Sequence, residues 1–245
     1  MKKQLFILAT ITTIVFTSCS KEKIEAPQTN QPEEIAGARG GGGIIASVDL
    51  KKGLLGLFEF NGNLIDKTGK LEDGVTNTSG PASYTIDRKG FRGKAIKFNG
   101  IYSVSLTGVP HSARTSVAAW VKYDSANAMP SVIVSSQSDG PQFVQDYNYF
   151  YGYSNPSGNP KIYSGALNDQ WHFLVATIDG ATLRFYVDGS LVGSVASSDV
   201  DDSLITFYKL GGGYTAVTNW FGAMDDVRFY DRAISAAEVQ ALFNL

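Results

Sequence analysis

The sequence has few of the residues that build catalytic and metal centres. Its 245 residues include one cysteine and two histidines. No intramolecular disulfide can therefore form, and neither a cysteine-based zinc site nor a histidine-rich metal site can be assembled. The formal charge is -2, which leaves no basic surplus for a phosphate backbone. This balance argues against nucleic acid as a partner.

Motifs for catalysis are missing as well. Retaining glycoside hydrolysis needs two carboxyl groups about 5 Å apart, but the paired-acid spacing E-x-D-x-x-E is not present. After residue 48 the glutamates are Glu59, Glu72 and Glu238, each isolated in sequence. No G-x-S-x-G elbow accompanies His111 or His172, and no phosphate-cradling glycine loop precedes a helix. We therefore expect a protein that is not an enzyme.

The N-terminal segment carries a targeting signal. Two lysines precede an apolar run from Leu5 to Val15, too short for a comfortable membrane span, and Phe16-Thr17-Ser18-Cys19 follows it. This ending resembles a bacterial lipobox, although Phe16 stands where leucine is usual. The resemblance implies that residues 1–19 are a lipoprotein signal peptide and that lipidated Cys19 anchors the protein to a membrane. The alternative is an ordinary signal peptide with an incidental cysteine.

Residues 20–48 are interpreted as a flexible tether, because they are polar, contain Pro27 and Pro32 and end in four glycines. The charged residues after Cys19 resemble those of surface lipoproteins from Bacteroidetes-like bacteria. This implies an extracytoplasmic protein, lipid-anchored to the outer membrane and displayed at the cell surface. The folded domain is then expected over residues 49–245, with its start anywhere from about 43 to 52.

Residues 171–194 predict three short antiparallel strands. Apolar residues alternate from Leu183 to Val187, the period of a half-buried strand. Asp179-Gly180 and Asp188-Gly189 supply the positive-φ positions of tight hairpins. The letters WHFLVATIDG followed by LRFYVDGSLV resemble the signature of laminin G-like, concanavalin A-like jelly-roll domains.

The resemblance implies an all-β fold, a two-sheet antiparallel jelly-roll sandwich. The sequence outside residues 171–194 predicts further strands and a helix that agree with this fold. Ser235-Ala236-Ala237-Glu238 is a capping box that opens a short C-terminal helix. Further strands are expected within 54–60, 90–105, 115–123, 132–135, 142–153, 204–210 and 220–230.

The same resemblance implies a structural calcium ion that ties the first strand to the last. Asn61, Asp66 and Asp225 would be the nearest side chains, and their oxygens suit calcium. The alternative is that Asp66 caps a turn and that Asp225 or Asp226 is a solvated strand residue. The acidic segment from Asp199 to Asp202 is interpreted as a solvated loop.

Two groups of aromatic residues are candidates for binding carbohydrate, because an aromatic ring stacks on sugar rings while a tyrosine hydroxyl forms hydrogen bonds to them. Tyr147, Tyr149, Tyr151 and Tyr153 share one face of a predicted strand, unless that face packs between the sheets. Tyr214 and Trp220 flank a glycine-rich loop. We therefore expect non-catalytic carbohydrate binding outside the cell, the alternative being a protein-binding or structural cell-surface module. A solvent-facing aromatic strip would favour the first function and a broad apolar patch the second.

Overall fold

The computed structural model describes residues 48–78, 81–110, 112–136, 141–147, 149–154, 161–197, 205–213 and 219–245. The contacts of residues 46–245 define one unit. The predicted lipidation site Cys19 and the candidate Tyr214 lie outside the described residues. Among the residues that are described, no helix has the length and apolar character needed to cross a membrane.

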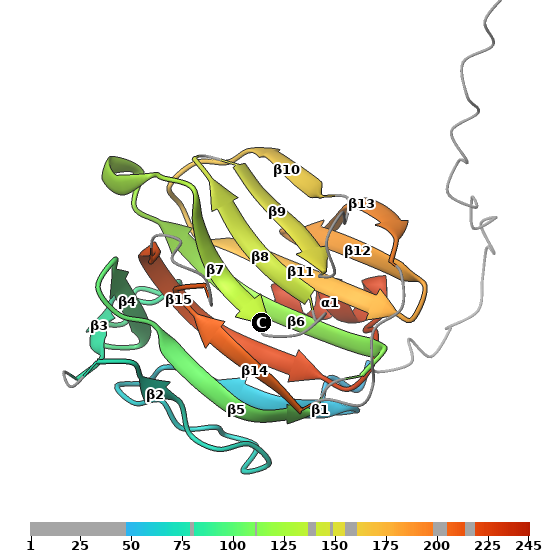
Figure 1. Cartoon of the computed structure of the whole chain (residues 1–245), viewed down its shortest axis with the longest axis horizontal. Coiled ribbons are helices and arrows are strands. Elements are labelled where there is room, and N and C mark those ends of the chain that lie inside the picture. The colour runs from blue at the N-terminus through green and yellow to red at the C-terminus, as the bar shows by residue number, and fades with distance from the viewer. Residues whose placement is uncertain are drawn as a thin grey trace, which may run out of the picture. The chain divides into compact units, whose positions relative to one another are not determined.

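One antiparallel sheet contains eight strands in the order β13-β12-β11-β6-β15-β4-β3, with β1 also paired to β15 (Figure 1). The predicted three-stranded segment forms β11 to β13, and its second turn has positive φ at Asp188 (50°) and Gly189 (81°), as a tight hairpin requires. The strands are β1 (Leu54–Phe58), β3 (Ser83–Thr85), β4 (Ala95–Asn99), β6 (Arg114–Tyr123), β11 (His172–Asp179), β12 (Thr182–Val187), β13 (Ser190–Ala196) and β15 (Phe221–Tyr230).

The other antiparallel sheet contains seven strands in the order β10-β9-β8-β7-β14-β5-β2. Its strands are β2 (Val75–Thr76), β5 (Val104–Pro110), β7 (Ser131–Ser136), β8 (Pro141–Asp146), β9 (Tyr149–Ser154), β10 (Ile162–Ala166) and β14 (Ile205–Leu210), and a short 3-10 helix η1 (Ser125–Asn127) precedes β7. The segment 142–153, predicted as one strand, is therefore two strands. The break falls at Tyr147, whose φ of 56° places it in the left-handed region.

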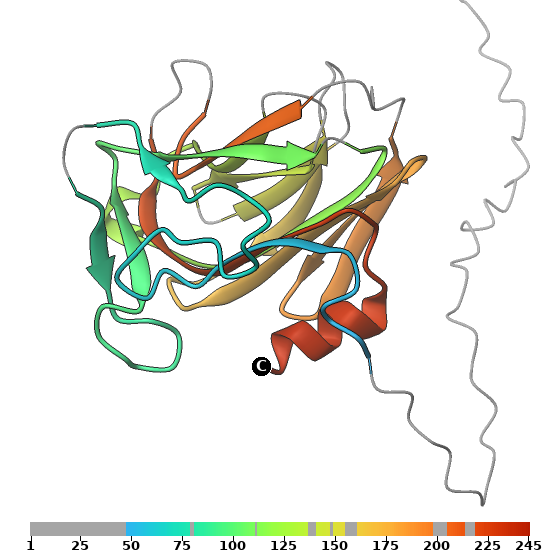
Figure 2. The ribbon, with the colours of Figure 1, turned by 90° about the horizontal axis from the view of Figure 1, so that it is seen from below.

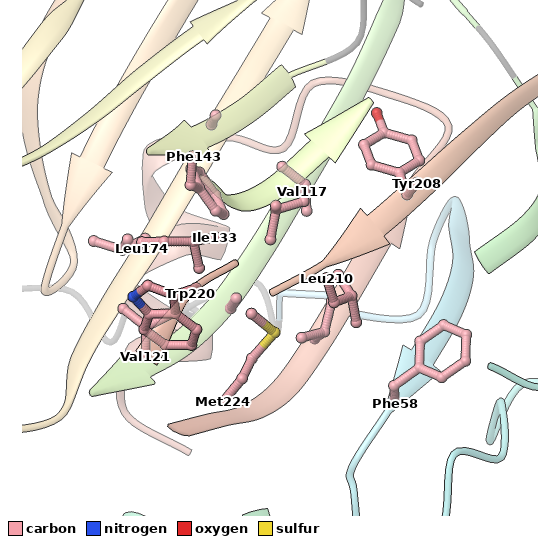
Figure 3. Packing of buried hydrophobic residues seen from close by; sticks show 14 of the residues in the cluster. Phe58, Val117, Val121, Ile133, Phe143, Leu174, Tyr208, Leu210, Trp220 and Met224 are labelled. Carbon is pink, nitrogen blue, oxygen red and sulfur yellow. The ribbon is translucent and has the colours of Figure 1, made fainter. Parts of the chain in front are cut away.

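The core lies between the two sheets. Met224 of β15 and Leu174 of β11 face Ile133 of β7 and Phe143 of β8 within one apolar cluster (Figure 3). Trp220, at the start of β15, is fully buried in this cluster, and its Nε1 donates to Gln145 Oε1 at 2.6 Å. Each fully buried side chain of this size contributes about 1.5–3 kcal/mol of transfer free energy.

Helix α1 (Ala236–Phe243) covers part of the outer face of the eight-stranded sheet (Figure 2). Its buried Val239 and Leu242 pack with Trp120 and Phe173 of the sheet. The predicted capping box is confirmed, since Ser235 accepts from the Glu238 amide and the Glu238 carboxylate accepts from the Ser235 amide. The two antiparallel sheets and this helix confirm the predicted jelly-roll sandwich.

Candidate functional site

An apolar and aromatic row crosses four strands on the outer face of the seven-stranded sheet. Tyr163 of β10 lies opposite Tyr151 of β9, which lies opposite Val144 of β8. Val144 in turn lies opposite Val132 of β7. The neighbouring Phe150 points into the core, so alternation directs this row away from it. The seven-stranded sheet therefore presents tyrosines on the face that does not pack against the other sheet.

Exposure increases toward the sheet edge. Tyr151 is 9% exposed, whereas Tyr163 is 46% and Tyr149 is 43% exposed. The rings of Tyr151 and Tyr163 lie 5.0 Å apart at an angle of 48°. We call the group formed by Tyr149, Tyr151 and Tyr163 the tyrosine cluster. It has two accessible rings, Tyr149 and Tyr163, and the buried Tyr151 ring in contact with Tyr163; exposed aromatic rings of this kind can stack on sugar rings.

A charged pair borders the tyrosine cluster. The Lys161 ammonium lies 4.6 Å from the centre of the Tyr151 ring, and Asp146 lies opposite Tyr149 in the register of β8 and β9. Burial raises the pKa of Tyr151, partly offset by the nearby Lys161 ammonium. The Tyr151 hydroxyl is therefore a neutral hydrogen-bonding group at physiological pH.

The first and last members of the predicted tyrosine row, Tyr147 and Tyr153, differ from the prediction or are not described by their side chains. Tyr147 belongs to the turn between β8 and β9 rather than to a strand, although its side chain is 60% exposed. Tyr153 lies in β9, but its side chain is not among those described. The prediction for Trp220 as a sugar-binding residue is wrong: the side chain has no exposed surface because it fills the core between the sheets. Of the second predicted group, Tyr214 lies outside the described residues.

Sequence reasoning missed Tyr163 and Lys161. They lie beside Tyr151 because β10 pairs with β9. The segment NPSGNP at 155–160 is dense in chain breakers and predicts a turn, so pairing the segments on either side of it would have placed Tyr163 close to Tyr151.

The predicted calcium ligands are not held as one group. Asp66 Oδ1 accepts from the amides of Leu57 (2.8 Å) and Thr68 (3.1 Å). Its Oδ2 accepts from Thr68 Oγ1 (2.6 Å) and from the amides of Lys70 (3.0 Å) and Leu71 (2.9 Å). Five hydrogen bonds leave this carboxylate little capacity for a cation that requires six to eight oxygen ligands.

Asn61 and Asp225 line a different feature, a cleft of about 320 Å³ that also contains Asp87, Arg88 and Asp226. Arg88 Nη2 binds Asp226 Oδ2 at 2.6 Å, and its Nε lies 3.8 Å from Asp225 Oδ2. Within the described residues, no three His, Cys, Asp or Glu side chains are grouped so that they could hold a metal ion. The residues Asn61, Asp66 and Asp225 therefore do not fit a shared calcium ion, and calcium binding stays a prediction.

Comparison with protein families gives a direct assignment. Residues 98–240 match the laminin G family model described as the concanavalin A-like lectin/glucanases superfamily. The chain belongs to this superfamily. The match spans β5 to α1 and thus includes the tyrosine cluster. No curated protein matches the chain significantly.

Solved structures share the fold of this superfamily member. Domain 4 of AbnA, an extracellular arabinanase from Geobacillus stearothermophilus, was solved with arabinotriose; it is 22% identical, with a TM-score of 0.66 over 77% of this chain and 97% of that domain. The binding domain of botulinum neurotoxin serotype D is 11% identical, with a TM-score of 0.61 over 78% of this chain. A related toxin domain was solved with rat synaptotagmin II at 12% identity and a TM-score of 0.60, over 80% of this chain. The chain spans about half the length of these toxin domains, 50% and 52% respectively. At these identities the likeness shows the fold alone.

Proposed function

We propose that this protein is a non-catalytic carbohydrate-binding protein, and that the tyrosine cluster on the outer face of the seven-stranded sheet contacts the sugar. The observation that supports this most is the solvent exposure of Tyr149 and Tyr163 on one sheet face, where the Tyr163 ring contacts Tyr151. Two accessible rings on adjacent strands offer apolar faces for sugar C–H groups, and their hydroxyls offer donors and acceptors.

The arabinanase domain that was solved with arabinotriose supports the same reading, because it shares the fold over nearly its whole length. A shared fold supports a function only by analogy, and the tyrosine cluster supplies the support that comes from this chain itself. Neutral oligosaccharides are the ligands proposed for this cluster, since its aromatic surface is bordered by one cation and one anion, Lys161 and Asp146.

The three glutamates of the described part lie in separate contacts, which supports a protein without a glutamate pair for hydrolysis. Glu59 accepts from Asn61, Glu72 from Thr107, and Glu238 from Arg232 and Ser235. Each glutamate is thus engaged in a different local contact, whereas glycoside hydrolysis needs two carboxyl groups facing one bond.

Binding of a protein is the second candidate function. One toxin domain with the same fold was solved with synaptotagmin. Here Leu191 and Val192 of the edge strand β13 are 54% and 37% exposed. An exposed edge strand can form backbone hydrogen bonds with a strand of another polypeptide, and apolar side chains on it add contact surface. This patch is smaller than the tyrosine cluster and has no aromatic residue in it, so we rank it second.

The test is a titration with neutral oligosaccharides, arabinotriose among them, chosen after a glycan-array screen of the purified protein. Replacing either exposed tyrosine (Tyr149→Ala or Tyr163→Ala) should weaken binding by about tenfold or more, because truncating an aromatic contact at the centre of a site costs more than about 1 kcal/mol. Phe91→Ala is the matched control, since Phe91 is an exposed aromatic residue (62%) away from this sheet face and should leave affinity unchanged.

Two results would count against the tyrosine cluster as a sugar site. One is an array on which no neutral glycan binds. The other is a bound glycan whose affinity is the same in Tyr149→Ala, Tyr163→Ala and the parent protein. In either case replacing Leu191 and Val192 with serine becomes the next experiment, with binding to surface proteins as its measurement.

A further inference from the structure

The opposite side of the sandwich contains a separate cleft of about 560 Å³ over the eight-stranded sheet. Its floor is a row of three residues from adjacent strands: Lys97 of β4, Ala223 of β15 and Lys122 of β6 lie directly opposite one another. Residues on either side of each of them pack into the core, so these three side chains point outward. We call this feature the lysine cleft.

The floor of the lysine cleft is hollow at its centre and cationic at its edges. Ala223 has only a methyl group, and a lysine stands on each side of it. Neighbouring strands lie about 4.8 Å apart, so the two lysine backbones are separated by about 10 Å. A flat ring with a charged substituent fits between two such ammonium groups.

Two connections of the chain contribute the wall residues that matter most, Trp171 and Arg88. Trp171, half-buried at the start of β11, gives one wall an aromatic surface. Arg88, in the β3–β4 connection, gives another, and it is fixed there by Asp226 and by the face of Trp120, 4.8 Å away. An indole face beside cationic side chains is complementary to a sugar ring that carries an acid group.

The acidic residues that line the lysine cleft are already engaged by the chain. Asp87 Oδ1 accepts from the amides of Lys89 (2.9 Å) and Phe91 (2.7 Å). Asp124 accepts from the Ala126 amide at 3.1 Å. The third acid, Asp169, accepts from Ser125 Oγ at 3.1 Å.

The two lysines of the floor have fewer contacts with acidic residues. Lys97 Nζ lies 3.7 Å from Asp124 Oδ2 and the Lys97 side chain remains 39% exposed. Lys122 makes no ion pair with any residue that the structure describes. The available cations of the lysine cleft are therefore the Lys122 ammonium and, in part, the Lys97 ammonium, and the ligand that complements them supplies negatively charged acceptors.

We propose that the lysine cleft is a second saccharide site, specific for sugars that bear a carboxylate, and that uronic acid residues bind there with the ring against Trp171 and the carboxylate between Lys97 and Lys122. The site is independent of the tyrosine cluster, which lies on the other sheet, and it takes a different class of ligand. One chain could then hold a neutral and an acidic part of a polysaccharide on its two faces.

Titration of the protein with uronic acid trisaccharides, trigalacturonate and trimannuronate, tests this proposal. We expect at least one of them to bind, its methyl ester to bind about tenfold more weakly, and affinity to fall with added salt, because charge-assisted hydrogen bonds to the lysines are lost or screened. Lys122→Gln and Lys97→Gln should each reproduce the loss seen with the ester. Lys89→Gln is the matched control: Lys89 is an exposed lysine of the adjoining connection that does not line the lysine cleft.

Equal affinity for the acid and its ester, no binding of either acid, or unchanged affinity in Lys122→Gln would overturn the proposal. A neutral oligosaccharide bound by the tyrosine cluster should be retained in Lys122→Gln and lost in Tyr149→Ala, which separates failure of one site from failure of the other. Thermal melting of each variant checks that the sheet is intact.

Discussion

Asp225 is a buried carboxyl group with a strongly raised pKa. It lies opposite Trp120 on the outer face of β15, beside Asp226, and is 6% exposed. Burial raises the pKa of its carboxyl group to about 7, and repulsion from Asp226 adds to the shift while the Arg88 guanidinium opposes it. The sequence alternative of a solvated strand residue is therefore wrong for Asp225, because Arg88 and the β3–β4 connection fold over this face of the sheet.

From the raised pKa of Asp225 we predict that the stability of the fold depends on pH. The folded-state pKa lies above the usual value of 3.8, so between about pH 4 and pH 7 the folded protein holds a proton that the unfolded chain has released. The free energy of unfolding should therefore fall as pH rises through this window, by on the order of 2–4 kcal/mol. Urea unfolding at a series of pH values measures the slope.

Asp225→Asn should remove this slope and make the protein more stable than the parent above pH 7. The neighbouring variant Asp226→Asn is the control; it should destabilise the fold at pH 7, since Asp226 holds Arg88 through an ion pair of 2.6 Å. An unchanged slope in Asp225→Asn would show that another group titrates.

At the scale of elements, the connection after β1 depends on one carboxylate. Burial alone would raise the pKa of Asp66, but hydrogen bonds from Thr68, Leu57 and Leu71 outweigh it and hold the pKa below the usual value. These bonds tie the connection to the edge of β1, because the Leu57 amide belongs to that strand. The alternative that Asp66 caps a turn agrees with this geometry.

Asp66→Asn should lower the free energy of unfolding by about 2–3 kcal/mol, since the amide nitrogen cannot accept and leaves backbone donors unsatisfied. We expect the same loss in calcium and in chelator, measured by thermal melting. Asp73→Asn is the control. We expect it to lower the free energy of unfolding by less, because the Asp73 carboxylate accepts one hydrogen bond, from the Asp66 amide, whereas the Asp66 carboxylate accepts five. A loss that appears only in calcium would instead support the predicted calcium role of Asp66.

The elements could be predicted where their signals are local. The β11–β13 hairpins and the capping box of α1 depend on alternation and on residues at most four positions apart. Tyr147 could not be placed, because tyrosine does not favour the left-handed backbone that it adopts in the β8–β9 turn. Trp220 was misplaced for another reason: its glycine-rich surroundings indicate a loop, while its contacts come from strands distant in sequence.

At the scale of the whole molecule, both candidate sites depend on strand pairings, between consecutive strands for the tyrosine cluster and between strands distant in sequence for the lysine cleft. Tyr151 was identified from its own segment, but its partner Tyr163 comes from another strand. The floor of the lysine cleft joins Lys97 of β4, Lys122 of β6 and Ala223 of β15, which are up to 126 positions apart in sequence, from 97 to 223. A one-dimensional pattern cannot show such a row, although it can show which face each residue occupies.

We predict that Cys19, a residue outside the described ones, attaches the whole protein to a membrane. The charged start, apolar run and small residues before Cys19 predict a lipoprotein signal. A diacylated or triacylated cysteine would hold the protein at a membrane, because each buried CH₂ contributes about 0.8 kcal/mol and more than one chain gives stable anchoring. Cys19→Ser should therefore move the protein from the membrane fraction to the soluble fraction, and mass spectrometry of the parent should find an acylated N-terminal cysteine.

Ser18→Ala is the matched control, since it keeps a small residue before the cysteine and should leave the protein in the membrane fraction. If Cys19→Ser stays with the membrane, the segment is not a lipoprotein signal, and attachment must be sought elsewhere in the chain.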